Sequence, residues 1–396
     1  MNRYLYIIHY LYFCFKVFFC DIISQRFEFY SHQLQIKVKT DTNEGILCGI
    51  IDITSPYSYS SQKYLLSLNE KKPKEIRQFQ IQENGNEYSV HEFQAFVMIN
   101  DDIKINSFNY FVFDRNYYNK HKSLSAFAFG FHIDNELHSL THSLSYNNPY
   151  MSSIFSLAFP NNVEEDYGYL FFGETPTKKM GKEAFNYNST INIKGNKKYW
   201  QTELTNIIIP KYFTVYNTNK YFTYFSTLTP YIILPKIIFE ELITQYFGDY
   251  LKSNKCKRFG YGVKEYDCPC SVVQKLPSIG FVMEENYYLL SSADLFFPYE
   301  NICVFNIISN EDEYGVDANH IVLGIRFLWN FVSEFDYEKK SITFFSNKPF
   351  GNINEIKGLL KRKLCFVVLL IIQSSLLLSI LLNSYVIFNN SKMRMS

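Results

Sequence analysis

Two short patterns recur in the two halves of this chain and limit the folds open to it. In the first half, "GIIDITS" around Asp52 is followed by "AFAFG", which ends at Gly130. In the second half, "YFSTLT" around Ser226 is followed by "HIVLG", which ends at Gly324. Each half therefore has a strand that enters a turn of small polar residues and a later apolar strand that ends in glycine. This repetition predicts two similar β-lobes, 27–180 and 181–350, that share a cleft.

The residues between these motifs are patterned as short strands. "HQLQIKVK" alternates Leu34, Ile36 and Val38 with polar residues, and a period of two is typical of a half-buried strand. Comparable runs recur as far as "SITFFS" and are separated by turn-forming residues. The sequence therefore predicts an all-β body. One packed helix is predicted after Pro235, with its apolar face formed by Phe239, Leu242, Ile243, Tyr246, Phe247, Tyr250 and Leu251.

The two ends of the chain are apolar. Arg3 is followed by an apolar run, which predicts a secretory signal peptide over 1–24, with an uncleaved anchor or a plain buried segment as the alternatives. Leu364–Phe388 contains 25 residues without a charge, enough to cross a bilayer. The basic residues after Phe388 argue against a lipid-anchor signal and leave 389–396 as a short cytosolic tail. We therefore expect a single-pass protein that contacts membrane lipid, with its body in the secretory lumen or outside the cell.

Charge and composition argue against nucleic acid, metals and other cofactors as ligands of this chain. The net charge of +1 gives no electrostatic footprint for nucleic acid. Three histidines, His132, His138 and His142, lie in a Ser- and Asn-rich stretch and are interpreted as solvated loop residues rather than a metal cluster. We expect neither a metal nor another cofactor. Asn188 begins an "NST" sequence, which predicts N-glycosylation.

Four cysteines of the second half are available for two disulfides in an oxidising compartment: Cys256, Cys268, Cys270 and Cys303. Cys268 and Cys270 also have the look of half a zinc site. No second pair at metal spacing accompanies them, so disulfides are the favoured interpretation.

The order of these motifs resembles that of the pepsin-like aspartic peptidases, from about 33 to 346. The resemblance is carried by "SIFSLAF", "YGYLFFG", "YWQTEL", "YIILPKIIFEEL" and the long closing run from "HIVLG" to "SITFF". It implies a bilobal fold in which Asp52 and Ser226 occupy the two catalytic aspartate positions. It also places Thr54, Ser55, Thr227 and Thr229 beside the substrate. By the same likeness, Cys303 pairs with either Cys268 or Cys270.

The chain departs from the family at the catalytic positions and in the turns around them. Two carboxylates that share one proton are required, since like charges so close together cannot both ionise, and Ser226 has no carboxyl group. Thr54 and Leu228 stand where the family has glycines. Ile53 lacks the hydroxyl that the family uses to bond across the lobes, whereas Thr227 keeps it.

These departures predict a membrane-anchored pseudo-peptidase that keeps a cleft for an extended peptide or protein segment but does not cut it. Two alternatives remain. One is an active aspartic endopeptidase that carries out proteolysis with Asp52 and a carboxylate from elsewhere in the chain. The other is a purely structural surface protein whose cleft is filled by its own side chains.

Overall fold

A computed structural model of the 396-residue chain describes most of the second half and scattered parts of the first. The described residues are 13–15, 34–40, 43–53, 58–60, 74–83, 86–98, 104–113, 127–131, 140, 143, 153–159, 167–173, 185–195, 199–210, 214–218, 221–259, 265–311 and 319–393. Thr54, Ser55, His132, His138 and His142 lie outside these ranges, as does the predicted signal peptide apart from 13–15.

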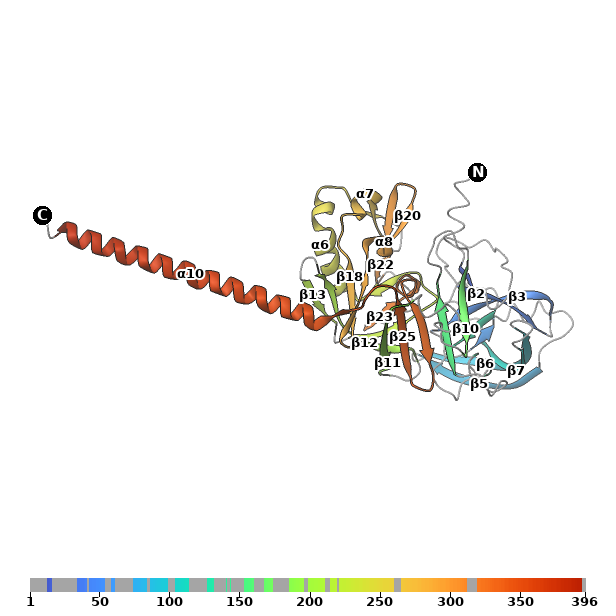
Figure 1. Cartoon of the computed structure of the whole chain (residues 1–396). Helices are drawn as coiled ribbons and strands as arrows, with labels where there is room; N and C mark the ends of the chain where they lie inside the picture. Colours follow the sequence, from blue (N-terminus) through green and yellow to red (C-terminus); the bar gives the residue numbers. More distant parts are fainter. Residues whose placement is uncertain are drawn as a thin grey trace.

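The described parts of the first half of the chain are mostly strands (Figure 1), and the first of them lies within the segment predicted as a signal peptide. The described strands of this half are β1 (Phe13–Phe15), β2 (Leu34–Thr40), β3 (Asn43–Asp52), β4 (Tyr59–Ser60), β5 (Lys74–Glu83), β6 (Asn86–Met98), β7 (Lys104–Phe113) and β8 (Phe127–Gly130). β5 and β6 form a long antiparallel hairpin in which Glu83 pairs with Asn86. The two residues between them, "NG", are the residue pair that a tight hairpin turn favours.

Strands from both halves join in one sheet. These strands are β9 (Ile154–Ala158), β10 (Tyr167–Phe172), β11 (Tyr187–Asn192), β24 (Val332–Asp336) and β25 (Ser341–Ser346). With the first lobe they make a 13-stranded sheet in the order β11-β25-β24-β9-β10-β1-β2-β3-β8-β4-β7-β6-β5. Because β24 lies directly beside β9, the end of the chain is fastened to the first half.

The second half forms two further sheets. The nine-stranded sheet contains β12 (Gln201–Ile209), β13 (Thr214–Asn217), β14 (Phe222–Phe225), β15 (Ile232–Leu234), β18 (Ile279–Met283), β19 (Asn286–Leu290), β22 (Ile307–Ser309), β23 (His320–Leu323) and β26 (Gly351–Asn352). The four-stranded sheet contains β16 (Lys257–Phe259), β17 (Glu265–Pro269), β20 (Phe296–Tyr299) and β21 (Ile302–Phe305). The all-β fold of the body is therefore confirmed.

Helices are few in the described body. They are α6 (Lys236–Lys252), α7 (Cys270–Val273), α8 (Ser292–Leu295) and α9 (Ile325–Leu328). α6 is the predicted helix, and Pro235 is its N-cap residue rather than part of its first turn. Its predicted apolar face is buried from Phe239 to Phe247, and Tyr250 and Leu251 pack on the core while partly exposed.

The last helix, α10 (Ile353–Met393), extends away from the body (Figure 1). Ile353 is buried against Ile208 and Val282, and its amide donates to the carbonyl oxygen of Glu285 at 3.0 Å. The segment Cys365–Asn383 is long and apolar enough to cross a membrane, and none of it is buried. This segment lies within the predicted span 364–388.

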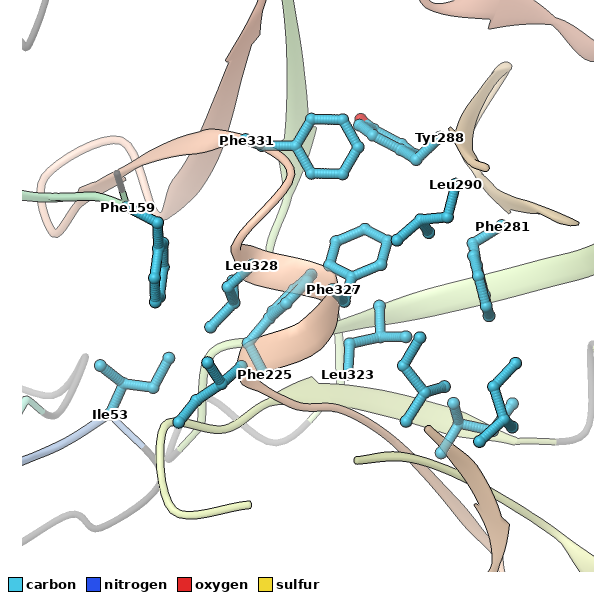
Figure 2. Packing of buried hydrophobic residues seen from close by; sticks show 14 of the residues in the cluster. Ile53, Phe159, Phe225, Phe281, Tyr288, Leu290, Leu323, Phe327, Leu328 and Phe331 are labelled. Atoms are coloured by element: carbon cyan, nitrogen blue, oxygen red, sulfur yellow. The ribbon is translucent and has the colours of Figure 1, made fainter. Parts of the chain in front are cut away.

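One large apolar cluster of the described residues runs through both lobes and is rich in aromatic rings. Phe327 at the centre packs within 5.3 Å of Phe331 and within 5.8 Å of Phe344, ring centre to ring centre. Figure 2 shows Phe327 between Leu328 and the side chains of β18 and β19. Burial of such large rings supplies much of the driving force for folding, and it fixes the strand ends that carry the site.

Candidate functional site

Asp52 is the last residue of β3, and the strand beside it holds it in place. β3 runs parallel to β8, with Asp52 opposite Gly130. The amide of Phe131 donates to the backbone oxygen of Asp52 at 3.1 Å. The amide of Gly130 donates to Oγ of Ser58 at 3.0 Å. The end of one strand and the start of the next are thereby locked around the Asp52 carboxyl group.

Ser226 occupies the equivalent place in the second lobe. It follows β14, which runs parallel to β23 with Phe225 opposite Leu323, and its amide donates to the Leu323 carbonyl at 3.1 Å. The strand order β3-β8-β4-β7 of the first lobe recurs as β14-β23-β15-β22 in the second. Both sets pair parallel, antiparallel, then parallel. The internal repeat predicted from the two motifs is therefore present in the structure.

The carboxyl group of Asp52 is buried, with 1% of the residue exposed. The hydroxyl of Tyr59 donates to its Oδ2 at 3.0 Å. Tyr59 is itself buried, on β4. Sequence reasoning missed this residue, because a tyrosine in a stretch rich in serine and tyrosine gives no signal of its own.

Ser226 is also buried, and its Oγ accepts a hydrogen bond from the amide of Leu228 at 3.2 Å. The side chain of Leu228 is partly exposed at the position where the family has glycine. Thr229 is buried, and its backbone oxygen accepts from the amide of Ile325 at 2.9 Å. The turn after β14 is thus held from within by the Ser226 hydroxyl and from outside by the backbone of Ile325, and it carries a hydroxyl at 226 and an apolar side chain at 228.

Thr227 joins the two turns. Its Oγ1 donates to the carbonyl oxygen of Ile51 at 2.6 Å and accepts from the amide of Ile53 at 3.2 Å. The expectation that Thr227 keeps a hydroxyl suited to bonding across the lobes agrees with this geometry. Ile53 contributes an apolar side chain that is 1% exposed and belongs to the common core. Figure 2 shows it at the edge of the cluster that also contains Phe159, Leu328 and Phe225.

Two further contacts fix the strand ends near the site, one between the lobes and one within the second lobe. Nε1 of Trp200 donates to the carbonyl oxygen of Phe131 at 2.7 Å, which ties the start of β12 to the end of β8. Gly324 fits against the turn of the second lobe, since a Cβ there would lie 2.2 Å from the carbonyl oxygen of Tyr231. Only glycine allows this approach.

Several other carboxylates are buried in the described part of the chain. Glu92 pairs with Arg77 at 2.5 Å, and Oε1 of Glu265 accepts from the Tyr231 hydroxyl at 2.6 Å. Burial raises the pKa of Glu265, and that hydrogen bond partly offsets the rise. Asp336 pairs with Lys339 at 2.8 Å. Each of these carboxylates has a bonding partner close by in the chain or within its own lobe.

The four cysteines form two disulfides, Cys256–Cys268 and Cys270–Cys303. The predicted pairing of Cys303 with Cys268 or Cys270 is confirmed, with Cys270 as its partner. Because Cys268 and Cys270 are both oxidised, neither is free to bind zinc. Among the described residues, no group of three or more His, Cys, Asp or Glu side chains is placed to hold a metal.

Asn188 is exposed on β11, opposite Phe345 of β25. Its glycosylation stays a prediction, as do the substrate contacts assigned to Thr227 and Thr229.

Comparison with known protein families agrees with this architecture. The family model described as eukaryotic aspartyl protease matches residues 131–346, more than half of the chain. The match begins downstream of Asp52 and includes Ser226. No curated protein matches the chain. The duplicated lobes, the shared sheet and this match show that the chain belongs to the eukaryotic aspartyl protease family.

Proposed function

We propose that this chain is a membrane-anchored pseudo-peptidase, which binds an extended peptide or protein segment between its lobes without hydrolysing it. The observation that carries the proposal is Ser226, which stands at the place in the second lobe that Asp52 holds in the first. The strands that lead into the two turns keep the same order in both lobes.

The chemistry of the family needs two acids. One carboxylate takes a proton from the attacking water while the other, protonated, polarises the scissile carbonyl. These two roles, base and acid, depend on the two carboxyl groups titrating together. A serine hydroxyl does not ionise at physiological pH, and Oγ of Ser226 already accepts a hydrogen bond from Leu228. Asp52 accepts a hydrogen bond from the Tyr59 hydroxyl, and a tyrosine is not the second carboxyl group that the reaction needs.

Peptide binding does not depend on the missing acid. An extended peptide is recognised through its backbone hydrogen bonds and through pockets for alternate side chains. The partly exposed Leu228 adds an apolar contact at the floor of such a site. The missing second carboxyl group and the retained strands together favour peptide binding without hydrolysis.

The anchor is Cys365–Asn383, an apolar helix with no buried part. The two disulfides support a body in an oxidising compartment. We therefore place the body in the secretory lumen or outside the cell, and the segment after the span in the cytosol.

The decisive experiment is a digestion assay on the purified full chain with unfolded casein at pH 3 to 7. No cleavage above background is expected. Cleavage that disappears in Asp52→Ala would overturn the proposal and identify an active endopeptidase. Contaminating protease activity would remain in Asp52→Ala, so the variant also serves as the control.

Two binding measurements separate the remaining alternatives. A statine-type inhibitor, whose hydroxyl sits between two carboxylates in active relatives, is expected to bind weakly and without pH dependence. An extended-peptide library is expected to yield ligands that the chain retains. Failure of every peptide to bind would leave only a structural role for the body.

A further inference from the structure

The apolar segment of α10 carries one side-chain amide near its middle, that of Gln373. No described residue hydrogen-bonds its amide, and the residue is exposed. Two neighbouring serines differ from it. Ser374 donates to the carbonyl oxygen of Leu370, and Ser375 donates to that of Ile371 at 2.8 Å. These two serine hydroxyls are thus satisfied within their own helix, and the glutamine amide is not.

This difference matters inside a bilayer. The hydrocarbon core offers no water to an amide, so an unbonded one is costly. A side chain near the end of a span can reach the headgroups, but one at the centre cannot. Glutamine side chains in spans are satisfied instead by hydrogen bonds to a neighbouring helix.

From this we infer that α10 associates with α10 of a second copy of this chain, through Gln373 at the centre of the interface. The inference rests on the proposed membrane anchoring. Two copies inserted with the same topology place Gln373 at the same depth. An amide has both donors and an acceptor, so two glutamines can bond each other reciprocally, and no third partner is needed.

The helix face around Gln373 suits such a pairing. At 3.6 residues per turn, Leu369, Leu376 and Ile380 lie on the same side as Gln373, at spacings of four, three and seven residues. These side chains are exposed and provide apolar ridges for packing against an identical helix. Ser375 lies about 200° around the helix from Gln373, on the opposite face.

The test compares two substitutions that each replace a polar residue with leucine. Full-length chains labelled with donor or acceptor fluorophores at the C-terminus are reconstituted together in phosphatidylcholine vesicles, and energy transfer is measured against protein-to-lipid ratio. Gln373→Leu is expected to weaken association by about tenfold. Ser375→Leu, which raises hydrophobicity on the other face, is expected to leave it unchanged, and Gln373→Asn to restore most of it.

Energy transfer that survives Gln373→Leu, or that is lost in Ser375→Leu, would overturn the proposed interface. Resistance to extraction at alkaline pH is measured on the same samples. Extraction of the wild-type chain would overturn the membrane anchoring itself, whereas an inserted chain without energy transfer would overturn only the association. Neither result bears on peptide binding by the body.

Discussion

The hydroxyl of Thr227 donates to the carbonyl oxygen of Ile51 at 2.6 Å, across 176 positions of sequence. Oγ1 of Thr227 also accepts from the amide of Ile53 at 3.2 Å, so one side chain fastens the turn of the second lobe to the turn of the first. The equivalent residue of the first lobe is Ile53, which packs into the core instead. The bonding across the lobes through these two positions is therefore one-sided, and it depends on Thr227.

Replacing this threonine tests how much the lobes depend on it. Thr227→Val keeps the shape but leaves the Ile53 amide and the Ile51 carbonyl without their partner in a buried site. We expect the free energy of unfolding to fall by about 2 kcal/mol, measured by chemical denaturation. Thr227→Ser keeps the hydroxyl and should lose much less. Equal losses in both variants would mean that the methyl group matters more than the hydrogen bonds.

The close approach at Gly324 gives a second prediction. In Gly324→Ala the new Cβ would lie 2.2 Å from the Tyr231 carbonyl oxygen and 2.5 Å from that of Thr229. Because both neighbours are backbone atoms, the turn itself must shift, and we expect a loss of about 3 kcal/mol in unfolding free energy. Gly248 on α6 is the matched control, since nothing lies within 4 Å of its added Cβ. Gly248→Ala should stabilise the chain by roughly 0.5–1 kcal/mol.

The buried Glu334 predicts a pH dependence of stability. Burial raises the pKa of this carboxyl above its ordinary value of 4.5, the charge of Asp336 raises it further, and Lys339 partly opposes the shift. A raised pKa in the folded state means that the folded protein binds the proton more tightly than the unfolded chain. This contribution is complete below about pH 4.5 and is lost as the pH rises through the folded-state value.

Glu334→Gln should remove the loss of stability that occurs as the pH rises. Thermal midpoints measured between pH 4 and pH 7 are expected to show a gain for the variant at pH 7 and little difference at pH 4. Glu338→Gln removes the same charge from an exposed neighbour, whose carboxylate accepts from Ser153 at 2.7 Å, and should not reproduce the pattern. A gain of equal size at both pH values would contradict the assignment to Glu334.

The two disulfides should contribute unequally. Cys270–Cys303 closes a loop with a sequence separation of 33, and Cys256–Cys268 one of 12. Because the entropy removed from the unfolded chain grows with loop length, replacing the first pair by alanines should destabilise the protein by about 1 kcal/mol more than replacing the second. Denaturation of both double variants checks this. The reverse order would show that local packing, not loop closure, dominates.

Much of this architecture could be predicted from the sequence. Alternating apolar residues and the two motifs that end at Gly130 and Gly324 predict duplicated β-lobes, since the period of a pattern selects the element that buries it. The absence of a carboxyl group at residue 226 is a property of the side chain and needs no coordinates. The uncharged segment that ends at Phe388 likewise predicts a long apolar helix from its side chains alone.

Partners distant in sequence were decided only by the tertiary structure. Four cysteines allow more than one pairing, and the fold selects Cys270 for Cys303. Alternation says which face a strand buries but not which side chain lies opposite, so the hydrogen bond from Tyr59 to Asp52 and the contact of Gly324 with Tyr231 emerge only when the strands are assembled. Local pattern fixes the elements because it depends on neighbouring residues. The arrangement of the site depends on how those elements pack, and that is settled by the whole core at once.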